Sequence, residues 1–202
     1  MEKLELNFNQ RLEKQLEFII EIDKIKNILR KTKLFDGNRF ENDAEHSWTI
    51  SIMALLLQEY SNFSVNIEKV IIMLLIHNIV EIDAGDTFLY SSERGNQQKK
   101  EKEAAERIFG LLENDQKEYF INIWNEFEER ETNEAKFAAV FDRLEPMLQN
   151  YITEGYTWKK HNITYEMVIK NNRDIEIGSK EIWEFALKLL DKAVEKGYLI
   201  KY

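Results

Sequence analysis

Two of the three histidines, His46 and His77, stand in stretches that are otherwise rich in apolar residues. Burial alone would favour leucine or isoleucine at such positions, because a buried imidazole needs partners for both ring nitrogens. A single histidine on an apolar face is more often a hydrogen-bonded core residue than a ligand. A pair has to be weighed with its acidic neighbours, since imidazole and carboxylate groups together can hold a divalent cation.

Acidic residues crowd the same apolar regions. Glu81 lies one helical turn after His77, where its carboxylate could orient a ligand or act as a base on bound water. Asp142 stands inside the apolar run 137–144, and an ionised carboxylate there costs free energy unless a cation pairs with it. A divalent metal between helices would serve, and Arg143 is a rival partner. The acids that follow the second histidine are Glu81, Asp83 and Asp86.

The elements that carry these residues follow a helical pattern. Apolar residues recur at three- and four-residue intervals, and the sequence has one proline and seven glycines. This period predicts an all-α fold, with His46 in the first turns of one helix and His77 at the end of the most apolar one. The predicted helices cover about 12–30, 43–57, 66–77, 100–112, 116–128, 134–151, 165–171 and 179–196.

The first predicted helix has an apolar face that includes Leu16, Ile19 and Ile20. Arg30 and Lys31 close this helix, where positive charge suits the negative end of the helix dipole. A polar loop with a glycine turn signal follows, and it leads into the helix that carries the first histidine of the pair.

Three further features concern helix boundaries. Asp43 is expected to cap the second helix, and the polar segment 91–101 is expected to be a surface loop that leads into a helix. Pro146 follows four residues after Asp142, so it either kinks the helix that carries this acid or begins a new helix.

The composition fits one folded domain, residues 1–202, with 44% hydrophobic residues to offset chain entropy. The net charge of −9 argues against non-specific binding to a nucleic-acid polymer or an anionic membrane. The absence of cysteine excludes disulfides, thiolate metal sites and a cysteine nucleophile. No signal peptide or membrane span is apparent, so a cytoplasmic location is expected. The four tryptophans, at helical positions, are expected in the core or at an interface.

Three segments in a fixed order carry a resemblance to a known family. They are Glu45-His46-Ser47-Trp48, the stretch 74–87 with His77-Asn78 and Glu81, and Phe141-Asp142-Arg143-Leu144-Glu145-Pro146. The chain resembles the HD-domain metal-dependent phosphohydrolases, and within them the branch that contains bacterial 5′-deoxynucleotidases. The similarity extends over most of the chain, including 158–161 and the last predicted helix.

The resemblance implies an all-α HD-domain helical bundle with one divalent cation between helices. The cation would polarise a phosphate oxygen and present a water to phosphorus, while carboxylates position or deprotonate that water and assist the leaving alkoxide. The implied residues are His46, His77, Asn78 and Asp142 for the metal, Glu81 and Asp86 for catalysis, and Arg30, Lys31 and Thr87 for the phosphate. A helix-end role for Lys31 and a hydrogen-bonded turn at 86–87 are the structural alternatives.

The chain departs from the family pattern at Asn78, where the family has the aspartate of its His-Asp doublet. An amide oxygen can still coordinate a hard cation, but it brings no charge, so metal affinity and activation of bound water should both fall. Two histidines with Asp142 and an amide discriminate little among Mn²⁺, Co²⁺, Fe²⁺, Ni²⁺ and Zn²⁺, and Mg²⁺ is a further possibility.

The predicted function is metal-dependent hydrolysis of phosphate monoesters, with (deoxy)nucleoside 5′-monophosphates as the leading small-molecule substrates. A homodimer is expected by analogy with the family. The first alternative is a catalytically impaired nucleotide-binding or regulatory protein, because of Asn78. The second is a helical interaction protein whose buried polar residues are satisfied internally. A protein that binds nucleic acid is the weakest reading, since no long basic stripe is present.

Overall fold

The computed structural model describes residues 8–91 and 94–201. The fold is helical apart from one short hairpin, so the all-α prediction is confirmed. The α-helices are α1 (Gln10–Ile22), α2 (Asp43–Leu56), α3 (Ile67–Ile76), α4 (Glu81–Ala84), α5 (Arg94–Phe109), α6 (Asn114–Glu129), α7 (Asn133–Ile152), α8 (Tyr156–Lys160), α9 (Tyr165–Asn172), α10 (Ile175–Gly178) and α11 (Lys180–Glu195). The shorter elements are the 3-10 turns η1 (Asp23–Asn27), η2 (Gln58–Tyr60) and η3 (His77–Val80), and the strands β1 (Leu29–Lys33) and β2 (Phe40–Asn42).

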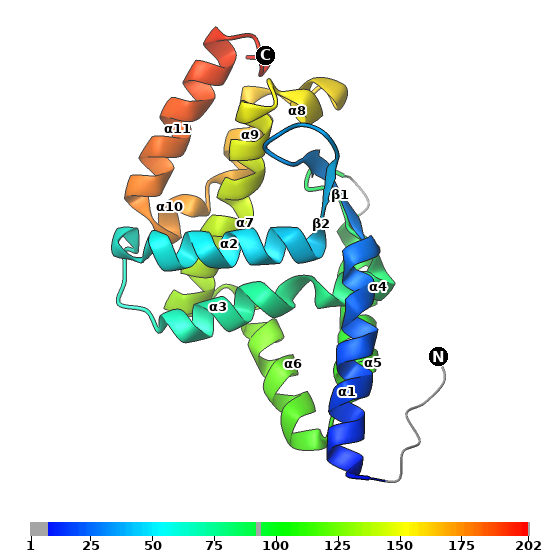
Figure 1. The fold of residues 1–202 in the computed structure, drawn as a ribbon. Helices are drawn as coiled ribbons and strands as arrows, with labels where there is room; N and C mark the ends of the chain where they lie inside the picture. Colours follow the sequence, from blue (N-terminus) through cyan, green and yellow to red (C-terminus); the bar gives the residue numbers. More distant parts are fainter. Residues whose placement is uncertain (1–7, 92–93, 202) are drawn as a thin grey trace.

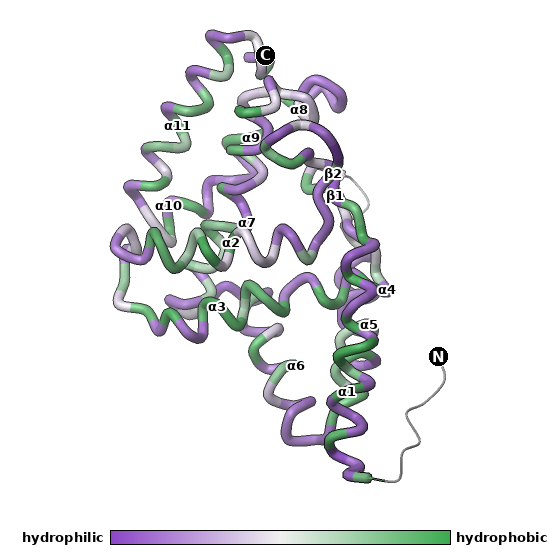
Figure 2. Tube along the Cα trace, in the orientation of Figure 1, coloured by the Kyte–Doolittle hydropathy of each residue, from purple (hydrophilic) through white to green (hydrophobic). Residues whose placement is uncertain are grey.

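Helices α2, α3 and α7 pack against one another at the centre of the fold. Figure 2 shows apolar residues along much of α2 and α3, and the fully buried Ile50, Leu74 and Phe141 come from the three helices in turn. The two histidines and Asp142 lie on this same trio or directly after it, so the packing that buries the core also brings them together.

The segment between α1 and α2 differs from the predicted helix over 12–30. Helix α1 ends at Ile22, and after η1 the chain forms the antiparallel hairpin of β1 and β2. Arg30 and Lys31 therefore lie on a strand and do not close a helix. Thr32 is buried next to the exposed Lys31, which is the alternating exposure of a strand that a helical reading of the segment missed.

The apolar face predicted for the first helix is also wrong. Leu16, Ile19 and Ile20 are exposed on α1, whereas Phe18 is buried and its ring stands 6.2 Å from that of Phe109 on α5. The helical period identified the helix correctly but chose the wrong face, because α1 carries apolar residues on two sides.

Helix α2 begins with a capping box that was not predicted. The side chain of Asn42 accepts a hydrogen bond from the backbone N–H of Glu45, and the carboxylate of Glu45 accepts one from the backbone of Asn42. Asp43, the predicted cap, is instead the first helical residue. Its side chain is buried and accepts a hydrogen bond from Arg30 at 3.1 Å.

Two other boundaries needed correction. Helix α5 begins at Arg94, so most of the segment 91–101 is helical and not a loop; residues 92–93 lie outside the described part of the chain. Helix α7 continues through Pro146 to Ile152, so the alternative in which this proline begins a new helix is wrong.

Among the described residues, no helix combines the length and the apolar character that crossing a membrane requires.

Candidate metal centre and substrate pocket

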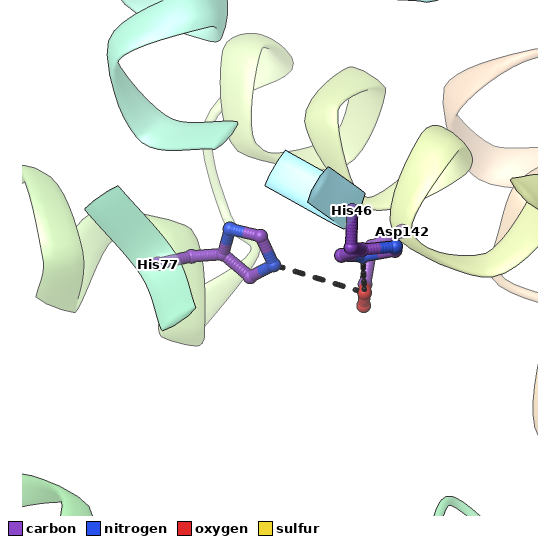
Figure 3. A group of neighbouring side chains, drawn as sticks. All are labelled: His46, His77 and Asp142. Atoms are coloured by element: carbon purple, nitrogen blue, oxygen red, sulfur yellow. Dashed lines mark hydrogen bonds and ion pairs between the residues drawn. The ribbon is translucent and has the colours of Figure 1, made fainter. Parts of the chain in front are cut away.

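The two predicted histidine ligands and Asp142 meet at one point (Figure 3). Nε2 of His46 lies 3.3 Å from Oδ1 of Asp142, and Nε2 of His77 lies 3.8 Å from the same oxygen. One ligand atom from each residue falls within 4.8 Å of the other two. Residues about 30 and 65 positions apart in sequence thus form a compact group of two imidazoles and a carboxylate, which is a donor set suited to a divalent cation.

His77 is prepared to act as a neutral ligand. Its Nδ1 donates a hydrogen bond to the carbonyl oxygen of Leu74 at 2.8 Å, which fixes the tautomer and leaves the lone pair on Nε2. Burial, together with the charges of His46 and Arg30, lowers the pKa of His77 to about 3. Nε2 is buried and has no hydrogen-bond partner in the described part of the chain, so the histidine fits a metal ion at this position.

His46 is completely buried and lies between carboxylates on both sides of its ring. In the metal-free protein, burial and Arg30 oppose its protonation, but the contacts with Asp142, Glu145 and Glu41 prevail and raise its pKa to about 10, so a cation at Nε2 would have to displace a proton. Asp142 is the carboxylate on the Nε2 side. Burial opposes its ionisation, yet Arg143 and the two histidines hold the pKa of this carboxyl well below its ordinary value.

Asn78 adjoins this group directly. It is buried in η3, one residue after His77, and its amide nitrogen lacks a hydrogen-bond partner among the residues that the structure describes. The unpartnered atom is a hydrogen-bond donor and does not coordinate a cation, so this amide could contribute to a metal site only through its oxygen. The group of His46, His77 and Asp142 therefore fits a divalent cation, with the amide of Asn78 next to it in the chain, and it does not select one metal.

A cavity of about 500 Å³ opens beside this group. This volume lies in the range of small-molecule sites. The cavity is lined by the predicted site residues Arg30, Lys31, His77, Asn78, Glu81, Asp86, Thr87 and Asp142. Of the predicted set, His46 does not line the cavity, because it is buried against Asp142. The structure therefore brings the whole predicted set together.

The carboxyl group of Glu81 faces the cavity and is strongly perturbed. Burial, followed by the charges of Asp43 and Asp86, raises its pKa to about 9. Its Oε2 is buried and forms no hydrogen bond with the described residues. Burial also raises the pKa of Asp86. Asp83 belongs elsewhere, since it forms an ion pair with Arg107 and does not line the cavity.

Arg30 is the centre of a buried charge network. Its guanidinium lies 3.1 Å from Asp43, 3.6 Å from Glu41 and 4.0 Å from Asp86. Burial opposes the charge, but Asp43 and Asp86 raise the pKa of the guanidinium. Arg30 thus compensates several carboxylates at the edge of the cavity, in addition to facing it.

Sequence reasoning missed other residues of the site. Glu41 and Glu145 contact His46; Glu145 follows Asp142 by three residues on α7 and so shares its helix face, a signal that was available. Glu41 depends on the hairpin, which was not predicted. Arg143, weighed only as a partner of Asp142, lines the cavity. The aromatic side chains that also line it are Phe88, Tyr90, Phe127 and Trp158.

Comparisons with known proteins identify the family of the chain. The family model described as HD domain matches residues 22–183. The protein named 5′-deoxynucleotidase HDDC2 from Danio rerio is 27% identical over 140 residues, which cover 68% of either chain. The human protein of the same name is 24% identical over 136 residues, covering 66% of this chain and 65% of the human one. The chain therefore spans about two thirds of the length of these relatives.

Solved structures extend the likeness to nearly the whole chain. The structure of a predicted metal-dependent phosphohydrolase from Magnetospirillum magnetotacticum is 51% identical, with a TM-score of 0.91 over 95% of this chain and 96% of that one. A conserved hypothetical protein from Pyrococcus furiosus, 20% identical with a TM-score of 0.60, shares the fold. The family and enzyme class expected from the sequence are confirmed, and the chain belongs to the HD domain family.

Proposed function

We propose that this protein is a metal-dependent phosphohydrolase that converts (deoxy)nucleoside 5′-monophosphates to nucleoside and phosphate. The observation that carries the proposal is the group of His46, His77 and Asp142 at the wall of a cavity of about 500 Å³. The names of the curated relatives support the substrate class, and the 51% identical structure supports the reaction type.

In this proposal His46, His77, Asp142 and the amide oxygen of Asn78 would hold a divalent cation, which would neutralise charge at phosphate and lower the pKa of a bound water. The His77–Leu74 hydrogen bond keeps the ligand nitrogen free of a proton. The donor set leaves Mn²⁺, Co²⁺, Fe²⁺, Ni²⁺, Zn²⁺ and Mg²⁺ open.

Glu81 and Asp86 exchange protons with the reacting groups in this proposal. A carboxyl group whose pKa lies near 9 keeps its proton at neutral pH, so Glu81 is suited to protonate the leaving 5′ oxygen. Asp86, beside Arg30 at 4.0 Å, is suited to orient the attacking water. Both face the same cavity, which allows them to act on one substrate.

The phosphate is bound by side chains that line the cavity. Lys31 and Thr87 line the cavity with Arg30, and Arg143 adds a cation next to Asp142, with its Nε 3.9 Å from that carboxylate. Cationic and hydroxyl groups of this kind bind phosphate oxygens. The aromatic side chains of the cavity provide an apolar wall for the nucleoside.

The test is phosphate release from a panel of deoxynucleoside and nucleoside 5′-monophosphates, with chelator-treated protein to which Mn²⁺ or Co²⁺ is added back. We expect release that requires the metal, with bound metal near one ion per chain. No release from any monophosphate with any of the metals, despite bound metal, would reject the hydrolase. Such a protein would match the alternative of an impaired nucleotide-binding or regulatory protein.

Asn78→Asp separates these two candidates. The added carboxylate brings a negative charge to the cation, so we expect metal affinity at least about tenfold higher and faster phosphate release. Asn133→Asp, exposed at the start of α7, is the matched control. Turnover that appears in Asn78→Asp and not in the wild type favours the impaired protein. Turnover in both the wild type and Asn78→Asp favours an enzyme that works with the amide. No gain in metal affinity would show that residue 78 does not face the cation.

We also propose that the protein forms a homodimer through α1 and α2. Both helices expose apolar residues at spacings of four, three and one residues: Leu12, Leu16, Ile19 and Ile20 on α1, and Trp48, Ile52, Leu55 and Leu56 on α2. Trp48 is 65% exposed and Leu56 72%, and large exposed apolar side chains gathered on one helix face are typical of association surfaces. Trp48 and Lys26 line one shallow hollow that joins η1 to the start of α2.

The double variant Trp48→Glu with Leu56→Glu should dissociate the dimer, because it places charges in an apolar contact. Light scattering after size exclusion should show twice the chain mass for the wild type and the single chain mass for the variant, with unchanged circular dichroism. Phe185→Glu, on the exposed side of α11, is the control and should leave the mass unchanged. A monomeric wild type at micromolar concentration would contradict the proposal.

Three expectations from the sequence stay predictions. They are the cytoplasmic location, action on a small molecule in place of a nucleic-acid polymer, and independence from membranes.

A further inference from the structure

The side of His46 that faces away from the cavity contacts two carboxylates. Nδ1 of its ring lies 3.2 Å from Oε2 of Glu145 and 3.5 Å from Oε2 of Glu41. All three side chains are at most 2% exposed. The carboxylates come from different elements, Glu145 from α7 and Glu41 from β2, so this arrangement is built by the tertiary fold.

Helix α7 holds the imidazole from both sides. Asp142 and Glu145 are three residues apart and so project from one face of the helix. Asp142 contacts Nε2 of His46 at 3.3 Å, and Glu145 contacts Nδ1. A ring held at both nitrogens cannot rotate without breaking a buried contact. The rotamer and the ligating nitrogen of His46 are therefore determined by the spacing of two residues on α7.

Glu41 and Glu145 also have fewer partners than buried carboxylates usually have. Oε1 of Glu145 and Oε2 of Glu41 are buried and form no hydrogen bond with the residues resolved in the structure. The nearest cation besides the imidazole is Arg30, whose Nε lies 3.6 Å from Glu41. Buried negative charge of this kind is costly unless positive charge lies nearby. A cation at Nε2 of His46 would provide it through the ring.

We propose that Glu145, with Glu41, is a positioning pair that strengthens metal binding from behind His46. The inference rests on the metal site of the proposed function. Neither residue contacts the cation; each accepts a hydrogen bond from, or lies against, Nδ1 and thereby orients the ring and makes Nε2 a better donor. Because Asn78 brings no charge to the cation, the two outer carboxylates supply negative charge that the ligands lack.

The experiment is a Co²⁺ titration of the whole chelator-treated protein, followed by calorimetry and by the visible absorption of bound Co²⁺. Glu145→Gln keeps the size of the side chain and removes its charge. We expect one ion per chain in wild type and variant, a Co²⁺ affinity about 10- to 100-fold lower in the variant, and a shifted Co²⁺ spectrum. Glu184→Gln, exposed on α11, is the matched control and should change neither.

The outcomes separate this inference from the proposed function. A wild type that binds no Co²⁺ rejects the metal site itself. One ion bound with equal affinity and an equal spectrum in Glu145→Gln rejects the positioning role alone. Two ions per wild-type chain would also overturn it, because Glu41, His46 and Glu145 would then ligate a second cation. If Glu145→Gln does not fold, Glu41→Gln tests the same pair with the same readouts.

Discussion

Replacing Asp142 by asparagine is expected to abolish metal binding at micromolar concentrations and to lower phosphate release by about 10³-fold or more. Metal-ion stabilisation of the transition state is generally worth several kcal/mol, which corresponds to a factor of this size. Asp142 is the one carboxylate in the proposed ligand set, because residue 78 is an amide. Its Oδ1 also lies 3.3 Å from Nε2 of His46 and 3.8 Å from Nε2 of His77.

The measurements are metal content after dialysis, phosphate release with added Mn²⁺, and thermal unfolding with and without Mn²⁺. Asp83→Asn is the matched control, since this acid is close to the site in sequence but pairs with Arg107 outside the cavity. The control should keep metal and activity. If Asp142→Asn retains the wild-type metal content, the cation is held elsewhere and the proposed ligand set is incorrect.

The candidate metal ligands stand out in the sequence because their chemistry conflicts with their surroundings. His46, His77 and Asp142 are polar residues in helices whose apolar period would otherwise be unbroken. Helices of that kind pack against one another in the core, so polar residues on their buried faces tend to meet. The structure confirms this for α2, α3 and α7.

The residues behind the ligands could not be predicted in the same way. Glu41 reaches His46 only because β2 pairs with β1, and the segment 29–33 lacks the strong β-branched or aromatic pattern that signals a strand. Arg30 was placed at a helix end for the same reason. Its contacts with Asp43 and Asp86 depend on the hairpin lying over the start of α2, which is a tertiary arrangement without a local signal.

The face of α1 shows a different limit. Hydrophobic periodicity identifies a helix, but it does not say what covers each apolar face. Phe18 packs on α5 and α6 through Phe109 and Phe120, whereas Leu16 and Ile19 are exposed. In the proposed homodimer this second face is covered by the other chain. The apolar residues on this second face of α1 would then be buried by the other chain, which a single chain cannot do.

Glu81→Gln is expected to lower phosphate release by about 10²- to 10⁴-fold, the usual contribution of a positioned acid or base. The same change should stabilise the metal-free protein at pH 8. The pKa of Glu81 in the folded protein, about 9, lies above the ordinary glutamate value of 4.5. The folded state therefore holds this proton more tightly than the unfolded state, and the carboxyl destabilises the fold increasingly as the pH rises from about 4.5 toward 9.

Glutamine has no such proton, so the stability difference between variant and wild type should be near zero at pH 4.5 to 5 and should grow with pH. At pH 8 we expect the free energy of unfolding of Glu81→Gln to exceed that of the wild type by about 1–3 kcal/mol, the typical cost of a buried polar group without a partner. Urea unfolding of the metal-free proteins at pH 5 and pH 8 measures the difference. Glu59→Gln, exposed in η2, is the control and should show no such pH dependence.

The two readouts of Glu81→Gln report on different properties of this carboxyl group. A loss of activity with unchanged stability at both pH values would mean that the carboxyl is solvated in solution and acts without a raised pKa. A gain in stability at pH 8 with full activity would mean that Glu81 is buried but does not transfer a proton in the reaction. Loss of activity together with a gain in stability is the result expected of a group whose burial is destabilising and is retained for its chemistry.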